Sequence, residues 1–98
     1  MTELIPGDIA FVVVESKREG YDRNIIVKCM LGKIGIYRDG AYYHFCPLKT
    51  VVGKEYESQL PLTNYIAESS NIDTGYRRKP NRYPVFTTKE KCIEWLKG

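Results

Sequence analysis

Residues 33–46, with the sequence KIGIYRDGAYYHFC, contain two runs that can pair on either side of Asp39-Gly40. Asp-Gly tolerates positive φ at both central positions of a turn, so it predicts a two-residue type I′ hairpin. The pairs on the apolar face would be Arg38 with Ala41, Ile36 with Tyr43, and Ile34 with Phe45. The pairs on the aromatic and polar face would be Tyr37 with Tyr42, Gly35 with His44, and Lys33 with Cys46.

Two strands are predicted in the N-terminal half of the chain, and the second of them leads into the hairpin. The run Ile9–Val14 is β-branched and apolar on both alternating faces, which is typical of a central strand covered on both sides. The strand that enters the hairpin begins near Ile25 and is interrupted by Gly32 and Gly35. Because glycine inside a strand marks a bulge or a bend, we expect a strongly curved sheet. Between the two strands, Ser16–Asn24 is predicted as a charged loop.

The middle of the chain carries weaker signals. We expect the third strand over Ala41–Cys46; Pro47, which cannot donate to a ladder, should either end it or place it at a sheet edge. Thr50–Val52 is predicted as another short strand, and Thr63–Glu68 as a short helix. Asn71–Pro84 is rich in turn formers and is predicted as a loop.

A C-terminal helix is the clearest signal after the hairpin. Tyr83–Phe86 is predicted as a short strand leading into it. Thr87 as N-cap and Glu90 three residues later form a capping box, so the helix should follow to about Lys97. Its apolar side would carry Cys92, Ile93, Trp95 and Leu96, with Glu94 pointing away.

Length and composition complete the fold prediction. The chain has 98 residues, 43% hydrophobic and 28% charged, which favours one globular domain over residues 1–98. We therefore predict the α+β class, with a curved antiparallel sheet of three to five strands, in the form of an SH3-like half-barrel, and a C-terminal helix. The alternative is a complete SH3-like barrel with the helix appended.

Cysteine usage and the N-terminus bear on the compartment. The three cysteines, Cys29, Cys46 and Cys92, are an odd number in apolar segments, where cysteine acts as a small hydrophobe. This pattern favours a reducing, cytoplasmic setting over a disulfide framework. The longest apolar run, Ile9–Val14, is too short for a signal peptide or a membrane span, so no membrane association is expected.

Catalytic and metal chemistry have little support in the sequence. His44 and Cys46 lie two apart on a predicted strand, but a metal site needs three or four ligands. The twelve acidic residues are scattered, with no pair at a spacing that predicts a shared acid–base site. We therefore expect a non-enzymatic protein without cofactor or metal.

Basic residues interleaved with tyrosine give the strongest functional signal. Within residues 75–83 the candidate contact residues are Tyr76, Arg77, Arg78, Lys79, Arg82 and Tyr83. Arginine can bind carboxylates in a planar, bidentate manner. Arginine and lysine also neutralise phosphates, and tyrosine rings can stack on exposed bases, so the tract could also bind nucleic acid. The tract could equally be a solvated loop that only keeps the protein soluble.

A second candidate surface is the aromatic face of the hairpin, formed by Tyr37, Tyr42 and His44. It could bind a peptide, a planar ligand or another protein, or it could be covered by the chain after residue 53 or by the C-terminal helix. Together these signals predict a small binding protein that acts on an acidic protein partner, as regulators and inhibitors of the phage type often do. The alternative is a sequence-tolerant nucleic-acid-binding protein. The net charge of +3 does not decide between them.

Overall fold

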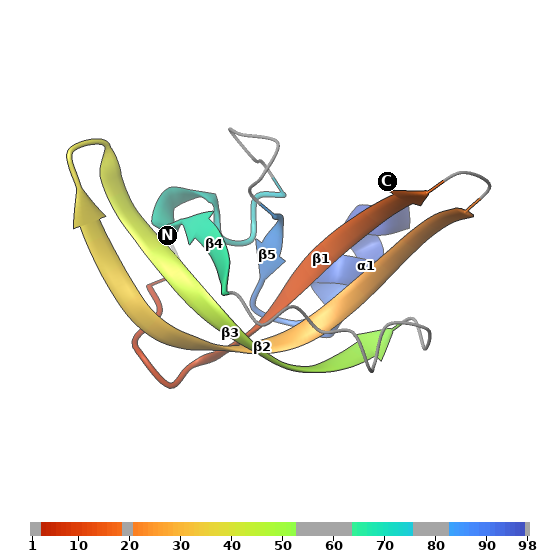
Figure 1. Cartoon of the computed structure of the whole chain (residues 1–98), viewed down its shortest axis with the longest axis horizontal. Helices are drawn as coiled ribbons and strands as arrows, with labels where there is room; N and C mark the ends of the chain where they lie inside the picture. The colour runs from red at the N-terminus through yellow and green to blue at the C-terminus, as the bar shows by residue number, and fades with distance from the viewer. Residues whose placement is uncertain (1–2, 19–20, 53–63, 76–82, 98) are drawn as a thin grey trace.

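A computed structural model describes the backbone of residues 3–18, 21–52, 64–75 and 83–97 (Figure 1). No helix in these ranges is long and apolar enough to cross a membrane. The elements in chain order are β1 (Ile9–Arg18), β2 (Tyr21–Tyr37), β3 (Gly40–Val52), β4 (Tyr65–Glu68), the 3₁₀ turn η2 (Ser69–Asn71), β5 (Val85–Phe86) and α1 (Lys89–Lys97).

The five strands form one antiparallel sheet with the order β4-β3-β2-β1-β5. The sheet is strongly bent, with β1 and the first half of β2 in one limb and the β2–β3 hairpin in the other (Figure 1). The predicted α+β class, with a curved antiparallel sheet and one C-terminal helix, is confirmed. The complete barrel is not formed, because within the described residues β4 and β5 pair with β3 and β1 and not with each other.

Strand β2 holds the two limbs together because it pairs with a different strand along each edge. It pairs with β1 from Tyr21 to Met30 along one edge and with β3 from Ile26 to Tyr37 along the other. The register between β2 and β3 shifts at Gly32, so that Leu31 pairs with Phe45 whereas Lys33 pairs with His44. Gly32 is therefore the extra residue of a β-bulge, as its position within the strand predicted.

Strand β3 is longer than predicted. It runs through Pro47 and includes Thr50–Val52, so Pro47 does not end the strand. The alternative prediction fits better, because β4 pairs only with Tyr42–Phe45 and the outer edge of β3 has no described partner at Pro47. Pro47 pairs with Cys29 next to a register shift, where the ladder is already irregular and the missing N–H is tolerated. A further shift follows between Ile26 and Val27. These irregularities bend the strand, which is how so long a hairpin can curve.

The hairpin turn also differs in detail from the prediction. Tyr37 pairs with Gly40, so the connecting residues are Arg38 and Asp39. Gly40 has φ +134°, whereas Asp39 is not among the residues with positive φ, so the turn is not type I′. The partners move by two residues, and Ile36 faces Ala41 instead of Tyr43. Because side chains alternate with a period of two, each residue that is paired in both registers keeps the face predicted for it, whereas Arg38, predicted to pair with Ala41, lies in the turn.

Two other predictions of local structure were wrong. The loop expected over Ser16–Asn24 is instead the end of β1 and the start of β2, which pair as far as Arg18 with Tyr21. Charged residues do not prevent a strand where the ladder satisfies the backbone. The helix expected over Thr63–Glu68 is strand β4 from Tyr65 onward, with Thr63 outside the described residues. Four residues are too few for periodicity to separate helix from strand.

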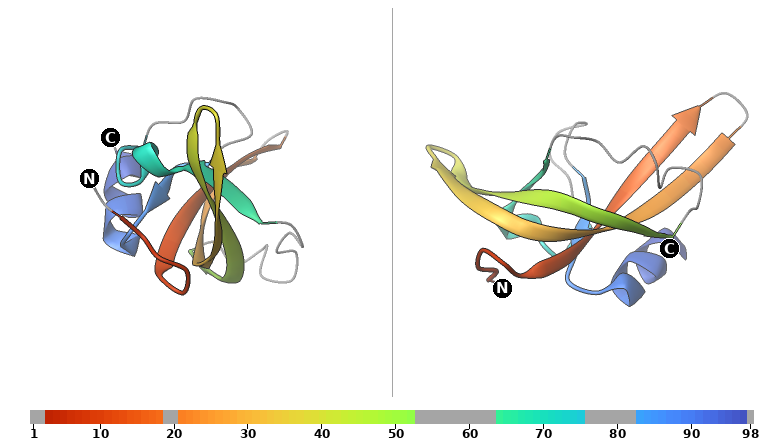
Figure 2. Two further views of the ribbon diagram at one scale, coloured as in Figure 1. Left: turned by 90° about the vertical axis from the view of Figure 1, so that its left-hand side faces the viewer. Right: turned by 60° about the horizontal axis from the view of Figure 1, so that its bottom comes forward.

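Each face of the sheet carries its own apolar core. The inner face, defined here as the face that bears Val12, Val27 and Phe45, holds the larger one. Its other members are Leu4, Ala10, Ile25, Cys29, Leu31, Tyr43, Tyr65, Ala67, Ile72 and Val85. On the outer face, Val13, Ile26 and Phe86 pack with α1, which lies beside the limb formed by β1 and β2 (Figure 2). Strand β1 is thus covered on both faces, as its composition predicted.

Helix α1 begins one residue later than its capping signal indicated. The amide of Lys91 donates to Thr88 Oγ1 at 3.2 Å, so Thr88 and not Thr87 is the N-cap. Thr87 is engaged by Asp73 instead. The predicted apolar side is confirmed, because Cys92, Ile93, Trp95 and Leu96 all belong to the outer core, whereas Glu94 is exposed.

The positive φ of Gly40 yields a test of the turn. Gly40→Ala should lower the free energy of unfolding by about 1 kcal/mol, because a side chain rarely adopts this φ even where the space beside it is open. Denaturant unfolding measures the change. Arg38→Ala, on the exposed residue of the same turn, is the control and should shift the midpoint little. Equal midpoints for Gly40→Ala and wild type would contradict this turn.

Candidate functional site

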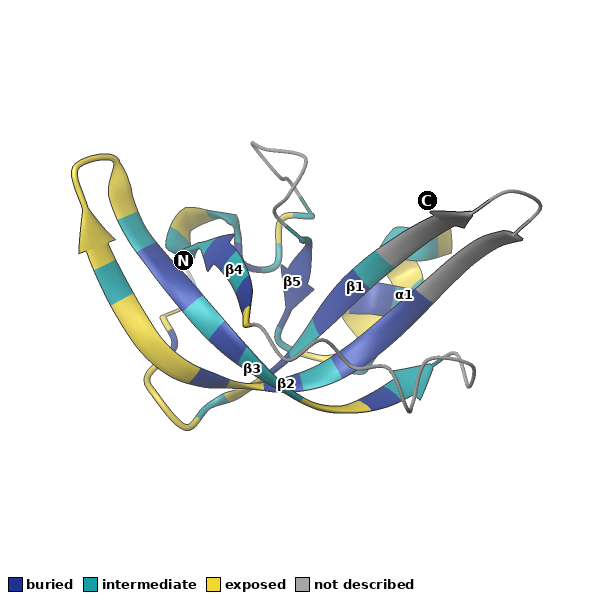
Figure 3. Cartoon of the chain, viewed as in Figure 1, coloured by how far each residue is buried: buried dark blue, intermediate teal, exposed yellow. Residues whose placement is uncertain are grey.

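The β2–β3 hairpin extends beyond both cores and exposes large apolar side chains. Ile36 is 78% exposed, Tyr37 56% and Ile34 37%. The end of β2 is accordingly the most exposed strand segment among those whose burial is described (Figure 3). Ile34 and Ile36 lie on the inner face, since they pair with Tyr43 and Ala41, while Tyr37 lies on the outer face. Single exposed apolar residues are common. Three of them within four residues at the end of one strand, two on the inner face and one on the outer, are typical of a contact surface.

On the outer face, Tyr37 is held by its neighbours. Its ring lies over Gly35, where a Cβ atom would stand only 2.6 Å from the ring. The ring also meets Tyr42 edge-on, with 5.3 Å between centroids. Tyr42 is 6% exposed and donates its hydroxyl hydrogen to Asp39 Oδ2 at 2.6 Å. Tyr42 thus supports the ring of Tyr37, and Gly35 provides the space for it.

Two cations flank Tyr37 on this side of the hairpin. Lys33 pairs with half-buried His44, and Arg38 lies in the turn; both basic residues are exposed. The two acids nearby are engaged within the fold, Asp39 by the hydroxyl of Tyr42 and Glu68 by the amide of Asn71 at 3.4 Å. The exposed groups around Tyr37 are therefore mainly its own phenol ring, Lys33 on the same face and Arg38 in the adjacent turn.

The strand edge beside this face is open. Leu31 bonds to the segment before β1, because its carbonyl accepts from the amide of Gly7 and its amide donates to the carbonyl of Asp8. Beyond Leu31, no described strand pairs with this edge of β2. Since Tyr37 and Gly40 close the hairpin as a hydrogen-bonded pair, the backbone groups of Ile34 and Ile36 point away from β3, toward the open edge.

The basic tract lies mostly outside the described residues. Tyr76, Arg77, Arg78, Lys79 and Arg82 therefore remain sequence predictions. Tyr83 is described: it is half-buried, packs against the inner core and meets Tyr65 edge-on at 5.0 Å. The structure thus brings Tyr37, Tyr42 and His44 together on the hairpin and places Tyr83 on the other face of the sheet.

Sequence reasoning missed a shallow cleft of about 410 Å³ where α1 meets the outer face. Lys28, Lys49 and Lys89 line it, together with Phe11, Val51, Thr87, Thr88 and Glu90. Lys28 and Lys49 are directly opposed across β2 and β3, which is unfavourable for like charges. The cleft could not be predicted from the sequence, because it requires β3 to continue past Pro47 to Lys49, and a proline does not indicate such a continuation.

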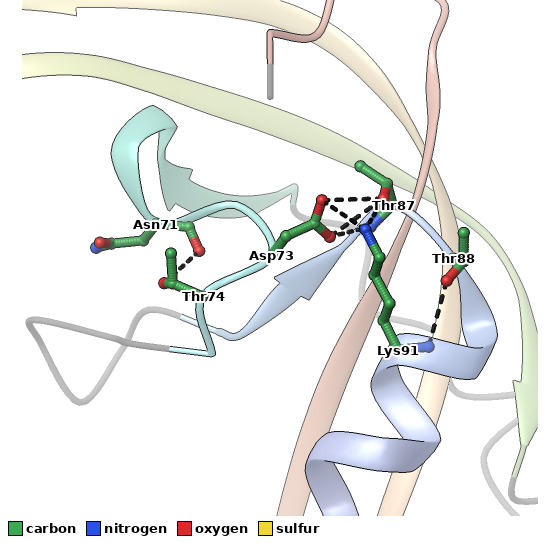
Figure 4. Close-up of polar contacts among 6 residues, drawn as sticks. All are labelled: Asn71, Asp73, Thr74, Thr87, Thr88 and Lys91. Carbon is green, nitrogen blue, oxygen red and sulfur yellow. Dashed lines mark hydrogen bonds and ion pairs between the residues drawn. The ribbon is translucent and has the colours of Figure 1, made fainter. Parts of the chain in front are cut away.

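Polar side chains converge on Asp73, a residue with φ +65° (Figure 4). Asp73 Oδ1 accepts from the amide of Thr87 at 2.7 Å, and Oδ2 accepts from Thr87 Oγ1 at 3.0 Å and Lys91 Nζ at 3.2 Å. Its own amide donates to the carbonyl of Val85. Burial tends to raise the pKa of Asp73, but the bonds from Thr87 and Lys91 outweigh it and lower the pKa. This cluster ties the chain before residue 76 to β5 and α1.

The three cysteines are free thiols. Burial raises the pKa of Cys29 and of Cys92 to about 12, so neither is a thiolate near neutral pH. Among the described residues, no group of three His, Cys, Asp or Glu side chains is arranged to hold a metal ion.

Comparisons of the chain with protein-family models, with curated proteins and with solved structures find no match. The functional inferences below therefore rest on the geometry of the hairpin and of the lysine-lined cleft.

The Asp73 cluster should make stability depend on pH. A carboxylate whose pKa is lower in the folded state stabilises the fold above its unfolded pKa, near 3.8, and that contribution is lost as the pH falls through the folded pKa. Asp73→Asn, which also tolerates positive φ, should cost about 1–3 kcal/mol at neutral pH. Its deficit relative to wild type should shrink in acid. An equal deficit at pH 7 and below pH 3, measured by urea unfolding, would contradict the charge-based account.

Proposed function

We propose that this protein is a non-catalytic binding protein that docks on an acidic surface of another protein through the outer face of the β2–β3 hairpin. The docking face consists of Lys33, Tyr37 and Arg38, with Tyr42 and His44 behind them. The observation that carries the proposal is Tyr37, an aromatic ring that is 56% exposed and yet held in place by Gly35 and Tyr42.

A fixed, exposed tyrosine is suited to a protein interface. Its ring can bury a large area on contact, and its few rotatable bonds keep the loss of conformational entropy small. Tyrosine and arginine are also enriched among the residues that dominate binding energy. Because Tyr37 already packs on Tyr42, little further ordering is needed when a partner binds.

Charge supports an acidic partner. Lys33 and Arg38 flank the ring and are exposed, and the chain carries a net charge of +3. Complementary charges speed association and exclude wrong partners more than they add affinity. The predicted basic residues Arg77, Arg78, Lys79 and Arg82 would strengthen the same preference.

The lysine-lined cleft favours nucleic acid as a second candidate ligand. An anion placed among Lys28, Lys49 and Lys89 would relieve the repulsion between the first two, which are directly opposed on the sheet. Phosphate groups of a nucleic-acid backbone meet that requirement without sequence selectivity.

One capture experiment separates the two candidates. The tagged protein is incubated with a cell lysate, with and without nuclease, and bound proteins are quantified by mass spectrometry. We expect a partner that survives nuclease and whose recovery falls at least about tenfold with Arg38→Glu or Tyr37→Ala. Lys97→Glu, a matched charge reversal at the exposed end of α1, is the control and should retain the partner.

Other outcomes decide against the docking face. A partner retained by Arg38→Glu and Tyr37→Ala would contradict it. Binding that disappears with nuclease and weakens with Lys28→Glu, but not with Arg38→Glu, would assign the function to the cleft instead. Thermal midpoints close to that of wild type would show that the exposed substitutions act on binding and not on folding.

A further inference from the structure

The open edge of β2 has a residue order that is nearly symmetric about its centre. Residues 33–37 are Lys-Ile-Gly-Ile-Tyr, with Gly35 in the middle and an isoleucine on either side. We propose that this edge, from Lys33 to Tyr37, pairs antiparallel with the same edge of a second copy of the chain. The twofold axis would pass between the two Gly35 residues, giving an isologous interface. This dimer and the proposed docking on another protein share Lys33 and Tyr37 on the outer face, but the hydrogen bonds of the dimer lie at the strand edge and its isoleucine contacts on the inner face.

The hydrogen-bonding groups of the edge fit this pairing. Ile34 and Ile36 direct their backbone N–H and C=O groups away from β3. In the symmetric register, Ile34 of one copy lies opposite Ile36 of the other, so each pair exchanges two hydrogen bonds. The bulge at Gly32 makes this possible, because it moves Ile34 and Ile36 into the positions that face the open edge.

The isoleucine side chains fit as well. Both lie on the inner face. Ile34 pairs with Tyr43, a residue of the inner core, and Ile36 is 78% exposed. Pairing two copies brings four isoleucines into one patch on that face and removes them from water. Cross-strand pairs of β-branched residues at this spacing stabilise a sheet.

The outer face of the paired edges avoids charge repulsion. In this register, Lys33 of one copy stands opposite Tyr37 of the other, so its ammonium meets a ring instead of a like charge. The two Gly35 residues form the close, non-hydrogen-bonded pair, and each is already covered by the ring of its own Tyr37. A lysine is a common means of discouraging edge pairing, but it does not oppose this particular register.

Among possible occupants, the second copy is favoured by this self-complementarity. An unrelated strand would have to supply the same alternation of apolar side chains and a group compatible with Lys33. Pairing with a second copy covers the open β2 edge of each chain with that of the other. No open β2 edge is then left to recruit a third chain. Arg38 lies in the turn beyond the paired edge, so both copies keep it accessible to another protein.

Sedimentation equilibrium from roughly 10 μM to 1 mM tests the dimer. The range is high because an interface of one five-residue strand segment from each copy is expected to be weak. Wild type should approach the mass of two chains as the concentration rises. Ile36→Lys should weaken the association at least about tenfold, because it places a charge in the isoleucine patch. Leu48→Lys, at an exposed leucine of β3 outside the edge, is the matched control and should leave the association unchanged.

Cross-linking tests the register. When Ile34→Cys and Ile36→Cys proteins are mixed and mildly oxidised, disulfide-linked dimers should form mainly between the two variants, because positions 34 and 36 are opposed. Wild type, with its native thiols alone, measures the background.

Several outcomes would overturn the proposal: a single-chain mass at every concentration, equal weakening by Ile36→Lys and Leu48→Lys, or no preference for the mixed cross-link. Arg38→Glu, which alters the docking face, should leave the dimer intact.

Discussion

The β-bulge at Gly32 is the feature on which the rest of the structure depends. Strand β2 pairs with β1 from Tyr21 to Met30 on one edge and with β3 from Ile26 to Tyr37 on the other, so its side chains lie first beside the cores and then in the exposed hairpin. Without the extra residue, Leu31 and Ile34 would lie on opposite faces of the sheet. With it, Leu31 fills the inner core and Ile34 continues the same face into the hairpin. The close approach of Cys46 Sγ, 3.0 Å from where a Cβ of Gly32 would lie, explains why glycine suits the position.

The bulge also separates a structural part of the molecule from an exposed one. Up to Leu31 the edge of β2 is satisfied by β1 and by the backbone of Gly7 and Asp8. Past Gly32, β2 pairs with β3 on one edge, its other edge has no described partner, and its apolar side chains are exposed to water. The Asp73 cluster and α1 pack against the opposite limb, so the end of the hairpin has neither core beneath it.

Part of this arrangement could be predicted from the sequence because the signals are local. Asp39-Gly40 identified the hairpin, Gly32 the bulge, and the spacing of Cys92, Trp95 and Leu96 the buried side of α1. The faces of the hairpin were also correct, since a shift of two residues preserves them. The Tyr37, Tyr42 and His44 face followed from that alternation alone.

What could not be predicted depends on contacts between distant segments. Pro47 was predicted to interrupt the strand because a proline lacks an N–H. It is tolerated inside β3 because its pairing with Cys29 is next to a register shift, which the sequence does not show. Thr87 looked like an N-cap because nothing local shows that Asp73 engages it. The open edge at Ile34 and Ile36 is visible only once the end of the β1 ladder is known. The lysine-lined cleft likewise needs the cross-strand register of Lys28 with Lys49.

Amide hydrogen exchange of the hairpin, followed by NMR at two protein concentrations, tests the central claim most directly. In dilute solution the amides of Gly35 and Tyr37, which bond to β3, should exchange slowly, while those of Ile34 and Ile36 should exchange quickly. At high concentration Ile34 and Ile36 should become protected. Exchange at these two residues that is fast and independent of concentration would contradict pairing with a second copy, and slow exchange in dilute solution would contradict an open edge.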